Sequence, residues 1–216
     1  MPGNIQLDPH VRDIFIRYGV RRSYHPGEVL EQKGDAGLQA GFLVEGHIRA
    51  FCLSPNGDEI SLFYLGPDNL FSSNALVYYP EVMVSLSALS PATAYLLPAD
   101  RFWMHWRELG YPPQDLMAHF IRRITLLSDY ICCSHFLEDD KRVAYFLYTC
   151  CQTSGQVIPY THEQIAAVTG MSRVSVTRIL KRFRQEGILR QSYRRIEVLD
   201  PGRLMEVFGA LGYFLD

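Results

Sequence analysis

The segment from Thr161 to Leu189, THEQIAAVTGMSRVSVTRILKRFRQEGIL, constrains the fold more than any other part of the chain. Its pattern predicts two short helices joined by a tight turn. Thr161 is a favourable N-cap, and Gln164 three positions later completes a capping box. Gly170 follows where the chain must turn, and Ser172 can cap the second helix. The segment therefore predicts a helix-turn-helix, the motif that lays its second helix into the major groove of DNA.

The second predicted helix has an apolar face and a polar, basic face. Val176, Ile179, Leu180 and Phe183 recur at helical spacing and form the face that we expect to be buried. Gly187 suits the position just after the helix, and the residues from 188 to 199 predict a hairpin, which completes a winged helix. The candidate DNA-binding residues lie on the other face or at the starts of the two helices: Thr161, His162, Ser172, Arg173, Val174, Ser175, Thr177, Arg178 and Lys181.

Charge supports this interpretation locally, although the whole chain has a formal net charge of only −2. Between Met171 and Arg195 there are eight basic side chains and a single acidic one, Glu186. A basic run alone usually marks a solvated helix face. Here it coincides with capped helices and an apolar stripe, and a local basic surface is what binding to phosphates requires.

The first half of the chain predicts an antiparallel β-domain. Gly and Pro recur as turn signals, Gly41 among them, and short apolar runs lie between these signals. Asn56-Gly57 predicts a hairpin turn between strands at 49–53 and 59–65. The expected fold class is α+β, with a sandwich or barrel of short strands followed by helices. The family resemblance described below implies that the strands form a β-roll of the cyclic-nucleotide-binding type (a jelly roll). With that resemblance, the expected domains are a sensory β-roll at 1–111, a long dimerisation helix at 112–137 and a winged helix-turn-helix at 138–216.

The predicted long helix carries an apolar seam. The helix can pack on the β-domain, on a second copy of the chain, or on both, with one face for each partner. We expect a homodimer joined through this seam. Its candidate dimerisation residues are Leu116, Phe120, Ile124, Leu127 and Ile131.

Several classes of protein receive no support from the sequence. No apolar run has the length of a membrane span and the N-terminus lacks a signal-peptide pattern, so we expect a cytoplasmic protein. The five cysteines, Cys52, Cys132, Cys133, Cys150 and Cys151, are odd in number and form no CxxC, which argues against a disulfide framework and a zinc ribbon. No catalytic triad, P-loop or Rossmann pattern is present, and we expect no enzymatic activity.

Over its whole length the chain resembles the CRP/FNR family of bacterial transcription regulators, through the helix-turn-helix segment and PGEVLEQKGDAGLQAGFLVEGHIRAF. The resemblance implies a homodimer, an effector pocket between β-roll and long helix, a palindromic DNA site and RNA polymerase as a partner. The family's base-reading positions correspond to Arg173, Val174 and Arg178. Relatives commonly have Glu where this chain has Val174. Valine offers only methyl contact, which suits thymine and predicts an A/T-rich site.

The sensory half is most similar to the CprK-like and CooA-like branches of the family, without their full sets of ligand residues. No Arg or Lys lies between Leu70 and Tyr95, which argues against cyclic AMP. The first cysteine, Cys52, comes too late for the family's N-terminal iron–sulfur cluster. We expect a small non-nucleotide effector, and no cofactor or metal. The candidate effector pocket consists of Phe63, Tyr64, Phe71, Tyr79, Leu127 and Tyr130.

Two alternatives stay open. A haem-based or redox-based gas sensor could use His47, His119, His135 or Pro2 as haem ligands, or Cys132 and Cys133 as a redox pair. At the positions of the haem-ligating Cys and His of the carbon-monoxide sensor, however, this chain has Ser72 and Asn74. A cupin-like metalloenzyme with an accessory winged helix would need clustered ligands, whereas the β-half offers only the distant His25 and His47.

Overall fold

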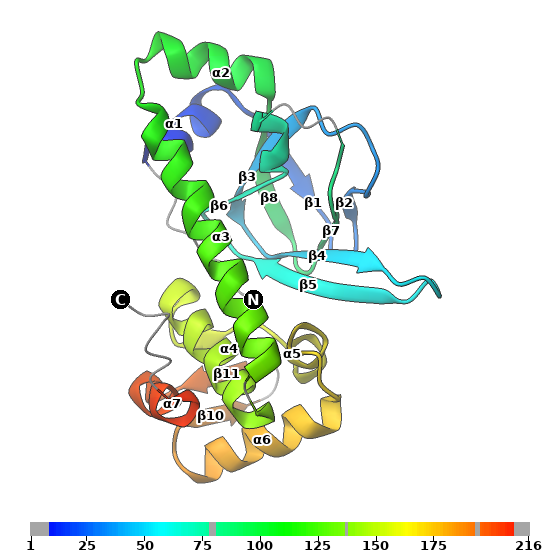
Figure 1. Cartoon of the computed structure of the whole chain (residues 1–216), viewed down its shortest axis with the longest axis vertical. Coiled ribbons are helices and arrows are strands. Elements are labelled where there is room, and N and C mark those ends of the chain that lie inside the picture. Colours follow the sequence, from blue (N-terminus) through cyan, green and yellow to red (C-terminus); the bar gives the residue numbers. More distant parts are fainter. Residues whose placement is uncertain (1–8, 78–80, 137, 193–194, 210–216) are drawn as a thin grey trace. The chain divides into compact units, whose positions relative to one another are not determined.

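The computed structural model describes residues 9–77, 81–136, 138–192 and 195–209 (Figure 1). Contacts divide the chain into two compact units, residues 3–124 and residues 125–216. The division falls inside the long helix α3 (Pro113–Phe136), and each unit is considered by itself. No helix in the described part of the chain is long and apolar enough to cross a membrane.

The N-terminal unit contains two four-stranded antiparallel sheets (Figure 1). The first has the order β1 (Val20–Tyr24), β8 (Ala92–Pro98), β3 (Gln39–Glu45) and β6 (Asn69–Phe71). The second has the order β2 (Val29–Glu31), β7 (Ser85–Ala88), β4 (Ile48–Leu53) and β5 (Glu59–Leu65). The hairpin predicted at Asn56-Gly57 is confirmed, because β4 and β5 pair across it and Gly57 has a φ of 88°.

The two sheets share a hydrophobic core. Leu43 and Phe71 from the first sheet pack in one cluster with Ile48 and Leu86 from the second. Side chains alternate along a strand, so Phe42, next to Leu43, points to the opposite face. The first sheet is therefore buried on both of its faces.

Helices cover the second face of the first sheet. They are α1 (Pro9–Tyr18), α2 (Ala99–Glu108) and the start of α3, while the short 3₁₀ helix η1 (Ser73–Val77) follows β6. Phe15, Phe102 and Leu116 from these three helices join Phe42 in a second core cluster. The sequence prediction of an all-β first half was wrong in this respect. Helices are needed there because the sheet has a second apolar face to bury.

Gly41 lies within β3, opposite Phe71 on β6, although the sequence pattern marked it as a turn signal. A Cβ at this position would lie 2.0 Å from the buried Phe71 ring. We expect Gly41→Ala to lower the free energy of unfolding by about 1–3 kcal/mol, because the core cannot take the extra methyl group. Chemical denaturation measures this change. The cost should shrink in a Phe71→Ala background, and an equal cost in both backgrounds would contradict the explanation.

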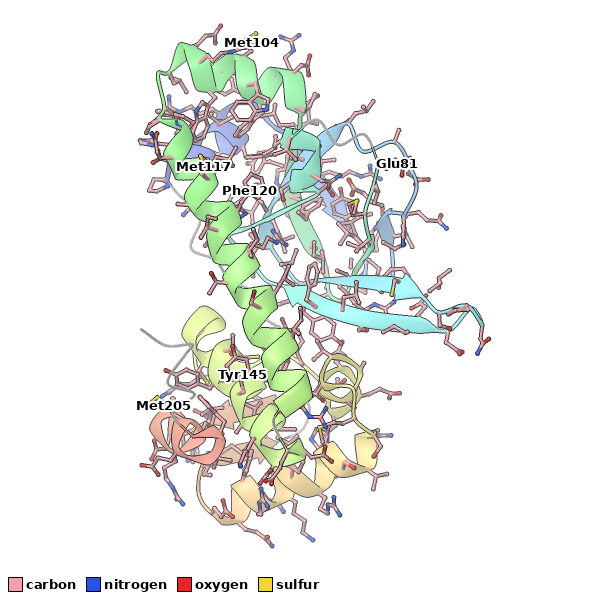
Figure 2. All side chains as sticks on the ribbon, in the orientation of Figure 1. Glu81, Met104, Met117, Phe120, Tyr145 and Met205 are labelled. Atoms are coloured by element: carbon pink, nitrogen blue, oxygen red, sulfur yellow. The ribbon has the colours of Figure 1, made fainter. Side chains whose placement is uncertain are left out.

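The C-terminal unit is a winged helix. Its elements are α4 (Asp139–Ser154), β9 (Val157–Ile158), α5 (His162–Thr169), α6 (Arg173–Gln185), β10 (Leu189–Ser192), β11 (Arg195–Val198) and α7 (Pro201–Phe208). The wing strands form a sheet of order β10-β11-β9. Helix α7 packs on α4, where the Phe208 and Tyr145 rings lie 5.5 Å apart (Figure 2). The predicted α+β fold, with a β-roll followed by a winged helix-turn-helix, is confirmed.

Candidate nucleic-acid interface and effector cavity

The helix-turn-helix is held together by the caps that the sequence predicts. The Thr161 hydroxyl accepts a bond of 3.2 Å from the Gln164 N–H, and the Gln164 side chain accepts one of 2.8 Å from the Thr161 N–H. Gly170 takes the left-handed conformation at the turn, with a φ of 67°. The Ser172 hydroxyl accepts a bond of 3.0 Å from the Ser175 N–H. These local bonds fix where α6 begins and therefore which side chains its outer face presents.

The two faces of α6 divide as the sequence predicts. Val176, Ile179, Leu180 and Phe183 are buried against the rest of the unit. The exposed side carries Arg173, Val174, Thr177, Arg178 and Lys181, with Ser172 exposed and Ser175 half-buried at the start of the helix. Val174 is 80% exposed, the highest exposed fraction of any large apolar side chain among the described residues.

The basic run is partly neutralised by neighbouring acids. An Arg182 guanidinium nitrogen lies 2.9 Å from the Asp140 carboxylate on α4, and Arg190 lies 3.7 Å from Glu197 in the wing. Among the described residues, Arg173, Arg178 and Lys181 have no such ion pair, and all three are exposed. Arg184 and Arg195 are likewise exposed without an ion pair among the described residues, so three of the unpaired cations, but not all of them, lie on the face that carries Val174.

His162 joins α5, α6 and the wing. The Thr177 hydroxyl donates to the Arg173 carbonyl at 2.8 Å, so it must accept from His162 Nδ1 at 2.9 Å. His162 Nε2 is then unprotonated and accepts from the Gln191 side-chain amide, also at 2.9 Å. His162, Arg173 and Gln191 border a hollow of about 320 Å³, which Arg195 and the acidic Glu163 also line. A hollow at a helix N-terminus with two arginines can accept an anion such as a phosphate.

The bonds around His162 predict a pH dependence of stability. Burial, together with the nearby Arg173 charge, lowers the pKa of His162. The unfolded chain then binds more protons than the folded one between this lowered pKa and the ordinary value of 6.5. Stability is complete above 6.5 and falls as the pH drops through that window. We expect thermal melting without DNA, at about pH 7.5 and about pH 5.5, to show a smaller pH effect in His162→Gln than in the unchanged protein. An equal pH effect in both proteins would contradict this role of His162, since the other histidines are common to both.

A cavity of about 220 Å³ opens in the N-terminal unit between the second sheet, the β6–η1 segment and α3. Its lining consists of Glu31, Phe63, Leu65, Phe71, Ser72, Ser73, Asn74, Val82, Met83, Val84, Leu86 and Arg123. Among the predicted pocket residues, Phe63 and Phe71 line this cavity, whereas Tyr64 is buried in the protein core and does not. Leu127 belongs to the other unit, and the Tyr79 and Tyr130 side chains lie outside the described residues.

Arg123 is a candidate ligand-binding residue that the sequence prediction missed. Its guanidinium donates a bond of 2.8 Å to the Leu70 carbonyl and lies 5.7 Å from the centre of the Phe63 ring. Burial lowers the pKa of Arg123 to about 10, so it remains positively charged at neutral pH. The absence of Arg and Lys between Leu70 and Tyr95 therefore does not exclude cyclic AMP on the ground of charge, because α3 brings a cation to the cavity from outside that segment.

Glu31 supplies a negative group at the same cavity. The Ser72 hydroxyl donates a hydrogen bond to its carboxylate, and Ser72 itself adopts the left-handed conformation, with a φ of 52°. Burial raises the pKa of Glu31, although the bond from Ser72 opposes this shift. No ion pair joins Glu31 to Arg123 among the described residues, so the cavity has separate cationic and anionic groups.

Helix α3 has an exposed apolar stripe that differs from the predicted dimerisation seam. Leu116 is only 3% exposed and Phe120 packs beside it, so both belong to the core of their own unit (Figure 2). Of the predicted seam, Ile124, Leu127 and Ile131 are exposed. The exposed stripe consists of Met117, Ile121, Ile124, Leu127 and Ile131. Two residues of the predicted seam therefore pack within their own unit, because an amphipathic pattern does not show which partner covers it.

Only some of the residues suggested for a haem or metal site lie among the described side chains. His47 lies between β3 and β4, and His119 is buried in α3. The His135 side chain, the Cys132 and Cys133 side chains and Pro2 lie outside the described residues. Within the described part of the chain, no three His, Cys, Asp or Glu side chains are placed to hold a metal ion.

Comparison with known proteins finds a matching domain family for each of the two folded units. A family model of the cyclic nucleotide-binding domain matches residues 21–105, and a model of the Crp-like helix-turn-helix domain matches residues 141–207. The cyclic AMP receptor protein of Thermus thermophilus is 29% identical over 202 residues, which cover 93% of this chain and 94% of that relative.

Solved structures show the same fold. FixK2 from Bradyrhizobium japonicum superposes with a TM-score of 0.76 at 17% identity, and the match covers 89% of this chain and 98% of FixK2. A structure of CprK complexed with OCPA gives a TM-score of 0.71 at 20% identity and covers 96% and 97% of the two chains. The two domain matches follow the order of the two folded units, and the exposed basic face lies on the matched helix-turn-helix. The chain therefore belongs to the CRP/FNR family of DNA-binding transcription regulators.

Proposed function

We propose that this regulator binds an A/T-rich palindromic DNA site as a homodimer and that a small non-nucleotide effector in the cavity controls this binding. The observation that carries the proposal is the outer face of α6, where two unpaired arginines flank the exposed Val174. A helix that presents cations and one apolar side chain together suits the major groove, which offers both phosphates and thymine methyl groups.

The side chains divide into base-reading and phosphate-binding groups. Arg173 and Arg178 can bind guanine or phosphate, and Val174 can contact a thymine methyl group. Lys181 and the hollow around Thr161 and His162 supply phosphate contacts, which fix the register of the protein without reading the sequence. Ser172, Ser175 and Thr177 complete the predicted interface, although the Thr177 hydroxyl is already bonded within the protein.

A homodimer is supported by the exposed stripe on α3. Met117, Ile121, Ile124 and Ile131 follow one another at intervals of four, three and seven residues, which is heptad spacing. A two-fold dimer would place two recognition helices on half-sites about one helical turn apart. A regulator bound in this way at a promoter would have RNA polymerase as its further partner. The proposed role requires no catalytic activity.

A non-nucleotide effector is supported by the size of the cavity. At about 220 Å³ it is smaller than most pockets for drug-sized ligands, which are about 300–1,000 Å³. The rings of Phe63 and Phe71 occupy part of its wall, and Glu31 would repel a second negative group on the ligand. The control we propose is a population shift, in which the effector binds the DNA-competent form more tightly than the other form.

Selection of duplexes from a random library by the full-length protein tests this function. We expect the enriched sequences to contain two A/T-rich half-sites related by two-fold symmetry. An excess of unlabelled random DNA should compete weakly at moderate salt. Enrichment of an asymmetric single site would contradict the dimer, and no enrichment in either the presence or the absence of candidate effectors would contradict sequence-specific binding.

Val174→Glu should change the base preference at one position of each half-site. A carboxylate loses the methyl contact with thymine and accepts a hydrogen bond from the cytosine amine. We expect preference at that position to move from A/T toward C·G by about 1–3 kcal/mol, measured by fluorescence anisotropy on matched duplexes. Val174→Ala is the control, because it shortens the side chain without offering an acceptor. If Val174→Glu weakens all duplexes equally, this side chain does not read a base.

A further inference from the structure

His162 lies where α5, α6 and the wing meet, and only one of its ring nitrogens is free to change its protonation. Its Nδ1 donates to the Thr177 hydroxyl, whose own proton is used in the bond to the Arg173 carbonyl. Its Nε2 lies 2.9 Å from the side-chain amide of Gln191 on β10. The bond to Thr177 fixes Nδ1 as a donor, so a proton is gained or lost at Nε2.

Gln191 suits both charge states of His162. A glutamine amide carries two N–H donors and one carbonyl acceptor, and a half turn about its last bond exchanges them. The amide N–H donates to Nε2 when the ring is neutral, and the amide oxygen accepts from Nε2 when the ring is charged. The bond between α5 and the wing is therefore kept in both states, so the charge of His162 depends on the charges around it.

The hollow beside His162 holds more positive than negative charge. Arg173 and Arg195 line it, are exposed and form no ion pair among the described residues. Glu163 is the acid of the described lining and pairs with neither arginine, and Tyr160 is the remaining titratable side chain. A third positive charge beside two arginines is unfavourable in the free protein. Burial and the Arg173 charge accordingly lower the pKa of His162.

A DNA phosphate in this hollow would reverse the balance of charge. The phosphate is negative throughout the range in which a histidine titrates, and a nearby negative charge favours the charged imidazole. His162 would then bind a proton more tightly in the DNA complex than in the free protein. By linkage, affinity for DNA rises as the pH falls through the interval between the free and the DNA-bound pKa, and does not change above that interval.

We propose that the binding of DNA takes up a proton at His162, so that the affinity of this regulator for DNA increases under mildly acidic conditions. The inference rests on the proposed phosphate contact at the hollow, and it adds a regulation by pH to that interface. Acid has the opposite effect on the free protein, in which protonation of His162 lowers stability. The phosphate supplies the favourable charge that the free protein lacks.

Calorimetry on the full-length protein tests the uptake of protons directly. Titrations with DNA at about pH 6.5 in Bis-Tris and in MES differ in heat by the protons exchanged, because the two buffers have different enthalpies of ionisation. We expect net uptake of up to about one proton per subunit, and less uptake in His162→Gln. Both a random-sequence duplex and the selected palindrome serve as probes, since phosphate contacts do not read the sequence.

Variants at His162 separate its charge from its hydrogen bonds. Anisotropy with the random duplex, at constant ionic strength, compares affinity at about pH 8 and about pH 5.5. The unchanged protein should gain roughly three- to tenfold more affinity over this range than His162→Gln, which cannot take up the proton. His162→Arg carries a permanent charge and should bind tightly at both pH values. His25→Gln is the matched control, because His25 is exposed in the N-terminal unit and should leave the gain unchanged.

The outcomes distinguish this inference from the proposed function. Equal proton uptake by the unchanged protein and His162→Gln, or release of protons on binding, would overturn the inference. Selection of a palindrome without proton uptake would overturn it and leave the proposed function in place. Uptake with random duplexes but no sequence selection would support the role of His162 and contradict sequence-specific binding. If His162→Gln fails to fold, His162→Arg decides, because an undiminished pH effect in that variant would contradict the proposal.

Discussion

We expect Ile121→Glu to convert the proposed dimer into a monomer and nearly to abolish its binding to the proposed palindromic site. Ile121 lies in the middle of the exposed stripe on α3 and is 60% exposed in the single chain. Burial of an isoleucine in the dimer contributes about 1.5–3 kcal/mol per chain, and two unpaired glutamates at the seam add a desolvation cost. We therefore expect the dimer dissociation constant to rise by more than about a hundredfold.

Analytical ultracentrifugation across a concentration range measures this change. Leu53→Glu is a matched control, because Leu53 is 59% exposed and also receives a carboxylate, but lies at the end of β4, away from the stripe. The control should remain dimeric and bind DNA normally. If Ile121→Glu sediments as a dimer, the stripe is not the dimer interface. A monomer that still binds the palindrome with full affinity would show that dimerisation is not needed for recognition.

The parts of the fold that could be predicted from the sequence are those that depend on neighbouring residues. The capping box of Thr161 and Gln164, the left-handed Gly170 and the Asn56-Gly57 hairpin are each formed within a few positions of the chain. The buried and exposed faces of α6 follow from helical spacing alone. For this reason the fold of the DNA-binding half could be predicted from the sequence.

Features that depend on distant residues could not be predicted in the same way. Arg123 reaches the cavity because α3 runs past the β6 segment, and no local pattern shows that Arg123 contacts Leu70. Gly41 is required by the Phe71 ring on a neighbouring strand, which lies 30 positions later in the chain. The side of α3 that packs on its own unit depends on where α1 and α2 lie, and these helices were themselves missed.

The sequence also could not show which basic side chains are paired with acidic ones. The sequence has eight basic side chains between Met171 and Arg195 but does not show which of them are suited to bind DNA. The contact of Arg182 with Asp140 fixes α6 against α4, so Arg182 stabilises the unit and is a poor candidate for reading DNA. Arg178 has no such partner among the described residues and lies one helical turn after Val174 on the exposed face. This difference separates Arg178 from Arg182, and Arg173 is exposed and without an ion pair in the same way as Arg178.

Arg178→Ala should lower affinity for the selected palindrome by about 1–3 kcal/mol per half-site and relax the preference at a single base position. The reason is that a bidentate arginine discriminates guanine from the other bases, and alanine offers no donor. Anisotropy titrations on duplexes that vary at each position would measure both effects. Lys181→Ala is the comparison, since loss of a phosphate contact should weaken all duplexes about equally and reduce the salt dependence. If Arg178→Ala weakens all duplexes equally as well, Arg178 binds phosphate, and sequence reading must come from Arg173 and Val174.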